Sequence, residues 1–469
     1  MAERVSAGFF TLIFEVRFMS TTSRDGAIGS VLYRALWRWH FFAGLLILPF
    51  VLLLCVTGSI YLFKNSINDG LHAELRLVEP QSGPALAPST LVAAALTAHP
   101  GSLRGYNPAP APDRSAEVRI TGADGVKDTV YVDPYTGKVL GTLWDAGAAG
   151  SPIMYTVRKL HSLKSVGWAA ERIIEGVAGW MVLMTASGLY LWWPRGRKSG
   201  VVSVRGTPAK RVFWRDLHAV TGLVVGAFIV FLAMTGLPWS GYWGKKFYDY
   251  SYSLGLGMPD GYWSKYPVST VPLKEVVDRA PWAIENQPVP LSRSAAGVPA
   301  KLDDVVRTLD RLGMAPGYAI SIPTKPDGVF TASVYPDDIR QERVVHLDQY
   351  SGEVLYDMGL QDIGLLGRAA EWGVSIHMGQ AFGLANRLVL LAALAGIVLL
   401  AVSGCVMWWK RRPAGGLGAP TLPEGKRVPV PLLAFALATG LFFPMVGLSM
   451  LAFLVIEGAS YGVRSLRTA

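Results

Sequence analysis

The chain has 469 residues, of which 51% are hydrophobic and 17% are charged, and its formal net charge is +10. That composition is too apolar for an ordinary soluble protein and indicates a membrane protein with sizeable soluble parts. The basic residues gather in two short loops between apolar stretches, so membrane topology explains the positive charge and a nucleic-acid partner is excluded.

Five apolar stretches are long enough to cross a lipid bilayer. About 20 residues span a hydrocarbon core of roughly 30 Å, and the stretches that reach this length are 41–63, about 173–193, 219–239, 388–409 and 428–456. The early run VSAGFFTLIFEVRF is too short and too charged to span, and it lacks a small-residue cleavage site. We therefore expect no signal peptide there, and Met19 is an alternative start.

Two basic loops set the expected topology. Residues 194–217 hold seven Lys or Arg against one acid, and residues 410–427 hold five against one. Short basic loops stay in the cytoplasm, which places the N-terminus inside and the two long hydrophilic segments outside. The expected segments are a cytoplasmic N-terminal extension (1–28), a first spanning helix (29–63), a first outer module (64–160), a second helix with an outer lead-in (161–195), a cytoplasmic loop (196–213), a third helix (214–239), a second outer module (240–376), a fourth helix with its lead-in (377–411), a cytoplasmic loop (412–427), a fifth helix (428–456) and an outer tail (457–469).

The first and third spanning stretches repeat one pattern. Each begins with a histidine, has glycine four residues later and Thr-Gly 17 and 18 residues later. These residues are His40, Gly44, Thr57 and Gly58 in the first stretch, and His218, Gly222, Thr235 and Gly236 in the third. Eighteen residues make about five helical turns, so each histidine shares a helix face with its distant glycine. A flat ligand held by the histidine would need small residues there.

The second and fourth stretches repeat a different pattern, which runs without a gap over thirty-five residues. Counted from His161 and His377, both have Gly at +6, Ser-Gly at +26 and +27, Trp-Trp at +31 and +32, and Arg at +34. A straight helix from His161 to Trp193 would be about 48 Å long, which exceeds the membrane core. We therefore expect the chain to bend, or to lie along the interface, before Gly167.

The outer segments also share a mark, because YVDPYTGKVLG (131–141) and HLDQYSGEVLY (346–356) both place Asp four residues before Gly. This is the chemistry of a hairpin turn, so we interpret Asp133 and Asp348 as structural rather than catalytic. The sequence thus predicts an α-helical membrane protein with two periplasmic α+β modules. It is built as two parallel repeats of helix, module and helix, followed by a fifth transmembrane helix.

Two kinds of site have no signature in the chain. Its cysteines, Cys55 and Cys405, lie in spanning stretches and are interpreted as packing residues, so no disulfide framework or thiolate cluster is expected. Neither a GxGxxG motif nor a P-loop occurs, so no nucleotide-binding domain is visible. The remaining histidines, which lack repeat partners, are interpreted as solvated surface residues: His72, His99 and His346.

The four repeated histidines fit two bis-histidine sites at different depths. His40 and His218 begin outward-running helices and lie near the cytoplasmic face, whereas His161 and His377 precede inward-running helices and lie outside. Two imidazoles are too few for structural zinc, but they suit a haem iron with two axial ligands. The chain has no CxxCH motif, so both haems would be non-covalent b-type.

Other residues near these histidines have candidate roles in the same sites. The glycines in phase with them, Gly44, Gly58, Gly222 and Gly236, would admit the porphyrin close to the backbone. Arg38 and Arg215 could pair with haem propionates. Both are equally well explained as arginines that set the topology.

These features resemble those of the PepSY-associated transmembrane family, iron-regulated inner-membrane proteins that include siderophore-iron reductases such as ferrioxamine reductase. The marks are WRWH (37–40), WRDLH (214–218), the VDPYTGKV turn and the two SG…WW helix ends. The resemblance covers nearly the whole chain after residue 30. It implies periplasmic PepSY modules, a di-haem core in the bacterial inner membrane, axial ligation by the four repeated histidines, and electron transfer to ferric siderophores.

Two classes of function remain open. In the first, the chain is a haem-dependent ferric-siderophore reductase whose electron donor, in the absence of a nucleotide motif, is quinol or a separate reductase. In the second, the PepSY modules are non-enzymatic binding or regulatory domains, and the helices only anchor them in the lipid bilayer. The second class leaves the four repeated histidines unexplained, so the sequence favours the first.

Overall fold

The computed structural model describes residues 24–468 apart from 196–198, 259–264, 294–296, 415, 417 and 420–429. The extension before residue 24, with Met19, and most of the loop 412–427 therefore lie outside the described residues. Among the described helices, four are long and apolar enough to cross a membrane, and they match the first four predicted spans: Val31–Tyr61, Trp168–Trp192, Arg211–Trp239 and Gly383–Trp409.

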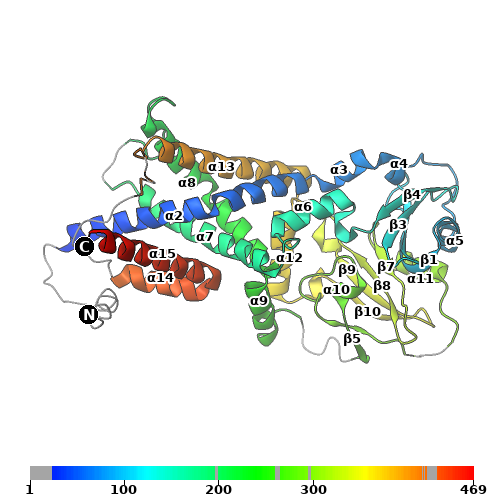
Figure 1. Ribbon diagram of the computed structural model, residues 1–469. Coiled ribbons are helices and arrows are strands. Elements are labelled where there is room, and N and C mark those ends of the chain that lie inside the picture. Colours follow the sequence, from blue (N-terminus) through cyan, green and yellow to red (C-terminus); the bar gives the residue numbers. More distant parts are fainter. Residues whose placement is uncertain are drawn as a thin grey trace.

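These four helices form a bundle with the sheet domain at one end (Figure 1). Their bounds are α2 (Arg24–Tyr61), α7 (Trp168–Trp192), α8 (Arg211–Gly236) and α13 (Gly383–Trp409). We call the end beside the sheet domain the sheet end and the opposite end the far end. The α2 and α8 helices run toward the sheet end, and α7 and α13 return from it. All four contribute to an apolar centre made of Ile47, Val51, Cys55, Val177, Val225, Ile229 and Ile397.

A short helix leads into each returning helix, namely α6 (Pro152–Ser162) before α7 and α12 (Leu365–His377) before α13. The chain breaks between α6 and α7 through Leu163, with φ of 53°, and Gly167, with φ of 124°. A residue in the left-handed region cannot continue an α-helix. The expected bend before Gly167 is therefore present.

Outside the bundle, the chain forms one antiparallel sheet of eight strands in the order β10-β9-β8-β7-β1-β2-β3-β4. The strands are β1 (Gly101–Asn107), β2 (Ala116–Gly122), β3 (Lys127–Val132), β4 (Val139–Trp144), β7 (Ala319–Ser321), β8 (Val329–Val334), β9 (Arg343–Asp348) and β10 (Val354–Gly359). The two expected outer modules are thus joined in one domain, because β1 pairs with β7 through Gly105 opposite Ser321. Pairing hides two strand edges that would otherwise expose unpaired backbone groups.

One hydrophobic core serves both halves of the sheet. Two helices, α5 (Pro88–Ala98) and α11 (Leu302–Arg311), pack beside each other, and the Ser89 hydroxyl donates to Asp303 at 2.7 Å. The fully buried side chains of this core come from both helices and both strand sets, and they include Leu91, Ala95, Val118, Ile120, Leu309, Ile320 and Val345. Each helix has one apolar face, and that face becomes buried only when it packs against the other helix and the sheet.

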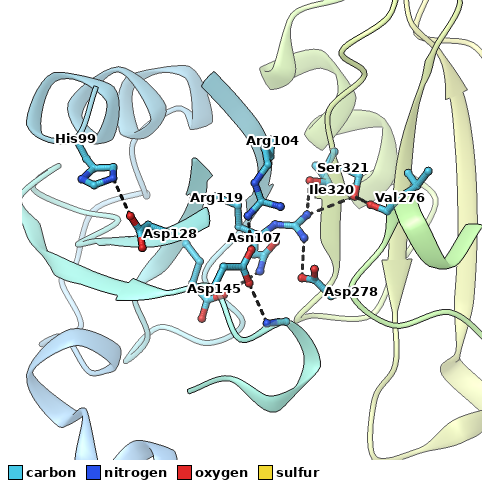
Figure 2. Close-up of polar contacts among 12 residues, drawn as sticks. His99, Arg104, Asn107, Arg119, Asp128, Asp145, Val276, Asp278, Ile320 and Ser321 are labelled. Carbon is cyan, nitrogen blue, oxygen red and sulfur yellow. Dashed lines mark hydrogen bonds and ion pairs between the residues drawn. The ribbon is translucent and has the colours of Figure 1, made fainter. Parts of the chain in front are cut away.

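Arg119 ties the two halves together across the β1–β7 junction (Figure 2). Its guanidinium, only 4% exposed, donates to Asp278 at 2.6 Å and to the Ile320 carbonyl at 2.9 Å. Both partners come from the second half of the chain. A buried guanidinium requires such partners, because an unpaired buried charge is costly.

Smaller elements connect the sheet domain to the bundle. They are α3 (Lys64–Leu71), α4 (Ala73–Arg76), α9 (Tyr242–Ser253), α10 (Leu273–Val276), β5 (Val268–Pro272) and β6 (Pro288–Pro290), with single turns at Gly147–Ala149, Leu237–Trp239, Ile339–Gln341 and Leu360–Asp362. The buried Trp282 packs on Phe247 and donates through Nε1 to the Pro238 carbonyl. This tryptophan therefore connects the domain directly to the end of α8.

The structure does not confirm the predicted single spanning helix over 428–456. The chain forms two helices there, α14 (Val430–Phe442) and α15 (Pro444–Thr468), which lie side by side as a hairpin (Figure 1). Pro444 cannot continue the preceding helix but fits the first turn of a new one. Gly440 and Gly447 meet at the crossing, where a Cβ on Gly447 would lie 2.6 Å from the Gly440 carbonyl oxygen. The end of α15 consequently lies at the far end, as does the start of α2.

Candidate functional site

The far end of the bundle brings His40 and His218 face to face. His40 lies on α2 and His218 on α8, and their ring centroids are 6.4 Å apart with the planes at 86°. A metal–imidazole nitrogen bond is about 2 Å long, so two rings that share one metal atom have centroids roughly 6 Å apart. The observed centroid separation of 6.4 Å is close to that value.

Each of these two histidines is held by a serine on the helix that packs beside it. His40 Nδ1 lies 2.9 Å from the hydroxyl oxygen of Ser187 on α7, and His218 Nδ1 lies 3.0 Å from that of Ser403 on α13. Both hydroxyls donate their own hydrogen to a carbonyl of their helix, at Met184 and Leu400. With their hydrogens on these carbonyls, the hydroxyl oxygens accept from the imidazoles, an arrangement that assigns the hydrogen to Nδ1 and leaves the Nε2 lone pair free.

The sheet end repeats this arrangement with threonines. The Nδ1 atom of His161, on α6, lies 2.9 Å from the hydroxyl oxygen of Thr57 on α2. The Nδ1 atom of His377, on α12, lies 2.9 Å from the hydroxyl oxygen of Thr235 on α8. The threonine hydroxyls donate to carbonyls of their own helices, at Leu53 and Phe231. These two imidazoles therefore also have Nε2 free.

Both sheet-end imidazoles are neutral at pH 7. Burial lowers the pKa of His161 to about 4. Burial and, to a smaller extent, the charge of His161 lower the pKa of His377 to about 4, so the two rings are near one another. A neutral imidazole with a free lone pair is the form that ligates a metal.

Glycines lie against the edges of all four rings. A Cβ would come within 3.3 Å of His40 Cε1 at Gly188, 3.6 Å of His218 at Gly404, 3.5 Å of His161 at Gly58 and 3.9 Å of His377 at Gly236. Of the four predicted glycines, Gly58 and Gly236 therefore lie beside a histidine. It is the sheet-end histidine, His161 or His377, and not the histidine that begins the same helix. Gly44 and Gly222 instead face Met184 and Leu400, so they serve helix packing.

The two predicted arginines have partners of their own. Arg215 donates to the carboxylate of Asp216 at 2.6 Å, and that carboxylate also accepts from Arg205. Arg38 lies over the Phe42 ring at 5.0 Å. These contacts do not assign either arginine to a haem propionate. The ion pair with Asp216 by itself accounts for the position of the Arg215 side chain.

The two histidine levels are separated by the apolar centre of the bundle. On α2, seventeen residues separate His40 from Thr57, the partner of His161, which corresponds to about 25 Å along the helix. The same spacing separates His218 from Thr235 on α8. The two pairs of histidines are therefore separate candidate ligand sites near the two ends of the bundle, with the buried aliphatic side chains between them.

The residues present fit a haem better than a bare metal ion. Within the described part of the chain, no group of three or more His, Cys, Asp and Glu side chains is placed to hold a metal. A metal with two imidazole ligands takes its remaining ligands from outside the chain, and the porphyrin of a haem supplies four of them. Free Nε2 atoms, fixed tautomers and glycines at the ring edges meet the requirements for such a plate.

Sequence reasoning missed the residues that position the histidines. These are Thr57, Thr235, Ser187, Ser403, Gly188 and Gly404, and each belongs to a Thr-Gly or Ser-Gly pair. Both pairs were visible as repeat marks at fixed distances from the histidines. Antiparallel pairing of neighbouring helices would have predicted these contacts. It places the threonine 17 residues after the first histidine, Thr57, beside the short helix that carries His161.

The other singled-out residues have structural roles. Asp133 and Asp348 cap their turns, accepting from the backbone N–H groups of Tyr135 and Tyr350, as expected. His346 is not a solvated surface residue, because it is 1% exposed and bonded to Thr331. His99 lies 3.1 Å from Asp128 (Figure 2), and His72 is half-buried.

Comparison with known proteins gives one family match. The family model described as "PepSY-associated TM region" matches residues 37–411, a range that contains all four bundle histidines and the whole sheet domain. No curated protein matches the sequence.

Proposed function

The chain belongs to the family of the PepSY-associated TM region, and from this premise we propose that it is a di-haem oxidoreductase that carries electrons across a membrane to ferric siderophore iron. One observation carries the proposal. Two pairs of histidines lie at two levels of an apolar bundle, each imidazole held through Nδ1 by a hydroxyl on a neighbouring helix. A membrane anchor alone has no need of this arrangement.

His40 with His218, and His161 with His377, would each hold one haem b. The hydroxyl partners keep Nε2 unprotonated and stop the rings from turning, so ligation needs no reorganisation. When bound, such a haem supplies reversible one-electron transfer. Buried apolar side chains fill the bundle between the two levels.

The far end is proposed to face the cytoplasm and the sheet domain the periplasm, in a bacterial inner membrane. Arginines and tryptophans gather at the far end, where Arg411 lies over Trp37 at 4.9 Å and Arg412 over Trp409 at 3.8 Å. Basic residues and interfacial aromatic rings mark the cytoplasmic boundary of a spanning bundle. The far-end histidine pair then lies on the donor side and the sheet-end pair on the acceptor side.

The donor is proposed to be quinol or a separate reductase, and the acceptor a ferric siderophore. Hard oxygen ligands hold Fe(III) far more tightly than Fe(II), so delivery of one electron frees the iron. Such a step needs no acid, base or nucleophile from the sheet domain. The acceptor class comes from the resemblance of the WRWH and WRDLH motifs to those of the siderophore-iron reductases.

Haem content tests the cofactor. Pyridine haemochrome analysis of the purified chain should give about two haems, because each histidine pair is one bis-imidazole site. His218→Ala should remove the far-end haem and leave the other spectrum unchanged. A folded chain without haem would leave the alternative, a non-enzymatic PepSY module with helical anchors.

Reoxidation tests the acceptor. The dithionite-reduced protein, kept anaerobic, should be reoxidised by a ferric hydroxamate siderophore, and a ferrous chelator should trap the product. The His218→Ala variant provides the matched control, because its sheet-end site can still be reduced directly by dithionite. Reduced haems that persist with several ferric siderophores would exclude the reductase assignment.

A further inference from the structure

A pair of buried carboxyl groups lies where the sheet domain meets the bundle. Glu342 follows the turn Ile339–Gln341, and Glu371 lies on α12; their exposed fractions are 2% and 0%. Glu371 accepts hydrogen bonds from the Trp282 backbone N–H and the Tyr335 hydroxyl. Both side-chain oxygens of Glu342 lack a hydrogen-bond partner among the described residues. An ionised carboxylate in that position would be strongly destabilised.

The groups around this pair carry too little positive charge to keep both carboxyls ionised. Among the described residues, the cation that acts on both carboxyls is the guanidinium of Arg279, which lies 3.2 Å from the Tyr335 ring centroid and donates to Gln380. Glu285 adds a further negative charge near Glu371. Two carboxyls that share a site with one cation retain a proton.

Burial is the main physical cause of this proton affinity. Burial raises the pKa of Glu371 to about 7, even though Tyr335, the Trp282 N–H and Arg279 lower it. Burial and the negative charge of Glu371 raise the pKa of Glu342 well above its usual range, and Arg279 offsets only part of this rise. Both carboxyls therefore bind protons more tightly than ordinary glutamates, and their titrations depend on each other.

We propose that Glu342 and Glu371 form a proton-binding site that takes up one proton when an electron arrives at the His161/His377 site. This inference rests on the proposed function. In this step one electron from the donor would convert the iron held by His161 and His377 from Fe(III) to Fe(II). One hydronium ion of the solvent would pass its proton to the carboxyl pair, so that one O–H bond forms on the pair and one breaks in the hydronium. The net charge of this end of the bundle is then unchanged.

The two sites are close enough to influence each other. Glu371 and His377 lie on one helix six residues apart, about 9 Å along its axis. In a medium of low dielectric constant, charges at that separation interact strongly, so added negative charge at one site raises proton affinity at the other. Arg279 connects the sites further, because it also contacts Met378, next to His377.

Infrared spectroscopy tests the proton site without reference to any haem. The full chain at pH 7 should show the C=O stretching band of a protonated carboxyl, and the band should be lost in Glu342→Gln. Glu353→Gln, the same change at a carboxylate that is 56% exposed, provides the matched control and should retain the band. Glu342→Gln breaks no hydrogen bond in the described structure, so it should fold. A band that survives Glu342→Gln would overturn the assignment of the pair.

Redox titration tests the coupling. Between pH 6 and 9 the midpoint potential of the sheet-end haem should fall by up to about 59 mV per pH unit, the value for one proton per electron. Glu342→Gln should flatten the slope and Glu353→Gln should not, whereas the far-end haem should show little slope in any variant. A wild-type potential independent of pH, or an unchanged slope in Glu342→Gln, contradicts the coupling. If the protein holds no haem, the proposed function and the coupling both fail, while the infrared band still decides whether the pair binds a proton.

Discussion

The hydroxyl partners of the histidines explain why Thr-Gly and Ser-Gly occur where they do. In each pair the hydroxyl accepts from an imidazole Nδ1, and the adjacent glycine leaves room for the ring edge. Thr57 and Gly58 do this for His161, and Ser187 and Gly188 do it for His40. An added Cβ would already lie 3.5 Å from the His161 ring at Gly58 and 3.3 Å from the His40 ring at Gly188, so a side chain longer than alanine has no room there. The hydroxyl and the adjacent glycine therefore position the ring together.

Thr57→Val should weaken the sheet-end site while the chain still folds. Valine matches the shape of threonine but leaves the His161 Nδ1–H without an acceptor, which typically costs a ligated metal 10–100-fold in affinity. Competitive haem transfer to an acceptor protein measures this loss. Thr156→Val is the matched control, because the Thr156 hydroxyl is exposed and bonds only within α6. Equal haem retention in both variants would show that the hydroxyl does not position His161.

At the scale of elements, the C-terminal hairpin decides where the chain ends. The α14 and α15 helices reverse direction at Phe443 and Pro444, and α15 packs along α7 as far as Phe453, whose ring lies 4.7 Å from that of Phe42. Phe42 is two residues from His40, at the far end. The hairpin therefore enters and leaves the bundle at one end.

Reporter fusions should place the C-terminus on the same side as the basic loops. Fusions after residues 205 and 468 should give the same reading, and a fusion after residue 110, in the sheet domain, should give the opposite one. The physical reason is that the chain reverses direction between α14 and α15, so the hairpin begins and ends at the same end of the bundle. If the fusion after residue 468 reports the same side of the membrane as the fusion after residue 110, the result would favour a single fifth spanning helix instead of the hairpin.

Gly179→Ala should loosen the hairpin from α7. An added Cβ would lie 2.8 Å from the Val446 side chain and 3.0 Å from the Phe443 ring, and overpacking of this kind costs about 1–3 kcal/mol. Thermal unfolding in detergent measures the loss. Gly70→Ala, on α3 with no atom within 4 Å of the added Cβ, should leave stability unchanged or slightly increased. A Gly179→Ala protein as stable as that control would mean the hairpin does not rely on this contact.

At the scale of the whole molecule, one sheet unites segments more than two hundred residues apart. Arg119 and Asp278 bridge the junction, and Trp282, four residues further on, anchors the domain to the end of α8. The sheet domain is consequently held at a defined place above the sheet-end histidines. Loss of the bridge should act on the domain as a unit.

Asp278→Asn should destabilise the sheet domain without removing haem from the far end. The change leaves the buried Arg119 guanidinium with carbonyl and hydroxyl acceptors only. Breaking a fully buried pair costs about 3–5 kcal/mol, but Asp278 is 30% exposed, so we expect about 1–3 kcal/mol. Limited proteolysis of the sheet domain measures this. The control variant Glu79→Gln, at an exposed carboxylate, should be cleaved at the same rate as the wild type. Identical cleavage rates for the wild type and both variants would refute the role of the Arg119–Asp278 bridge.

The sequence alone determined the features that depend on local composition and spacing. Apolar length identified four helices long enough to span a membrane, because the thickness of a bilayer sets one requirement for every span. The repeated spacing aligned His40, Gly44, Thr57 and Gly58 with the corresponding residues of the third spanning stretch. Asp133 and Asp348 correctly predicted two turns. The bend before Gly167 followed from length as well. None of these depends on which helix lies beside which.

Only the tertiary structure decided the features that depend on contacts between distant segments. Sequence spacing could not show that Thr57 holds His161, that β1 and β7 close two modules into one sheet, or that Pro444 reverses the chain rather than bending it. The carboxyl pair is the clearest case, because Glu342 and Glu371 are ordinary acids in the sequence. Their shared burial comes from packing a strand end against a helix, and packing geometry is set by the whole fold and not by any local pattern.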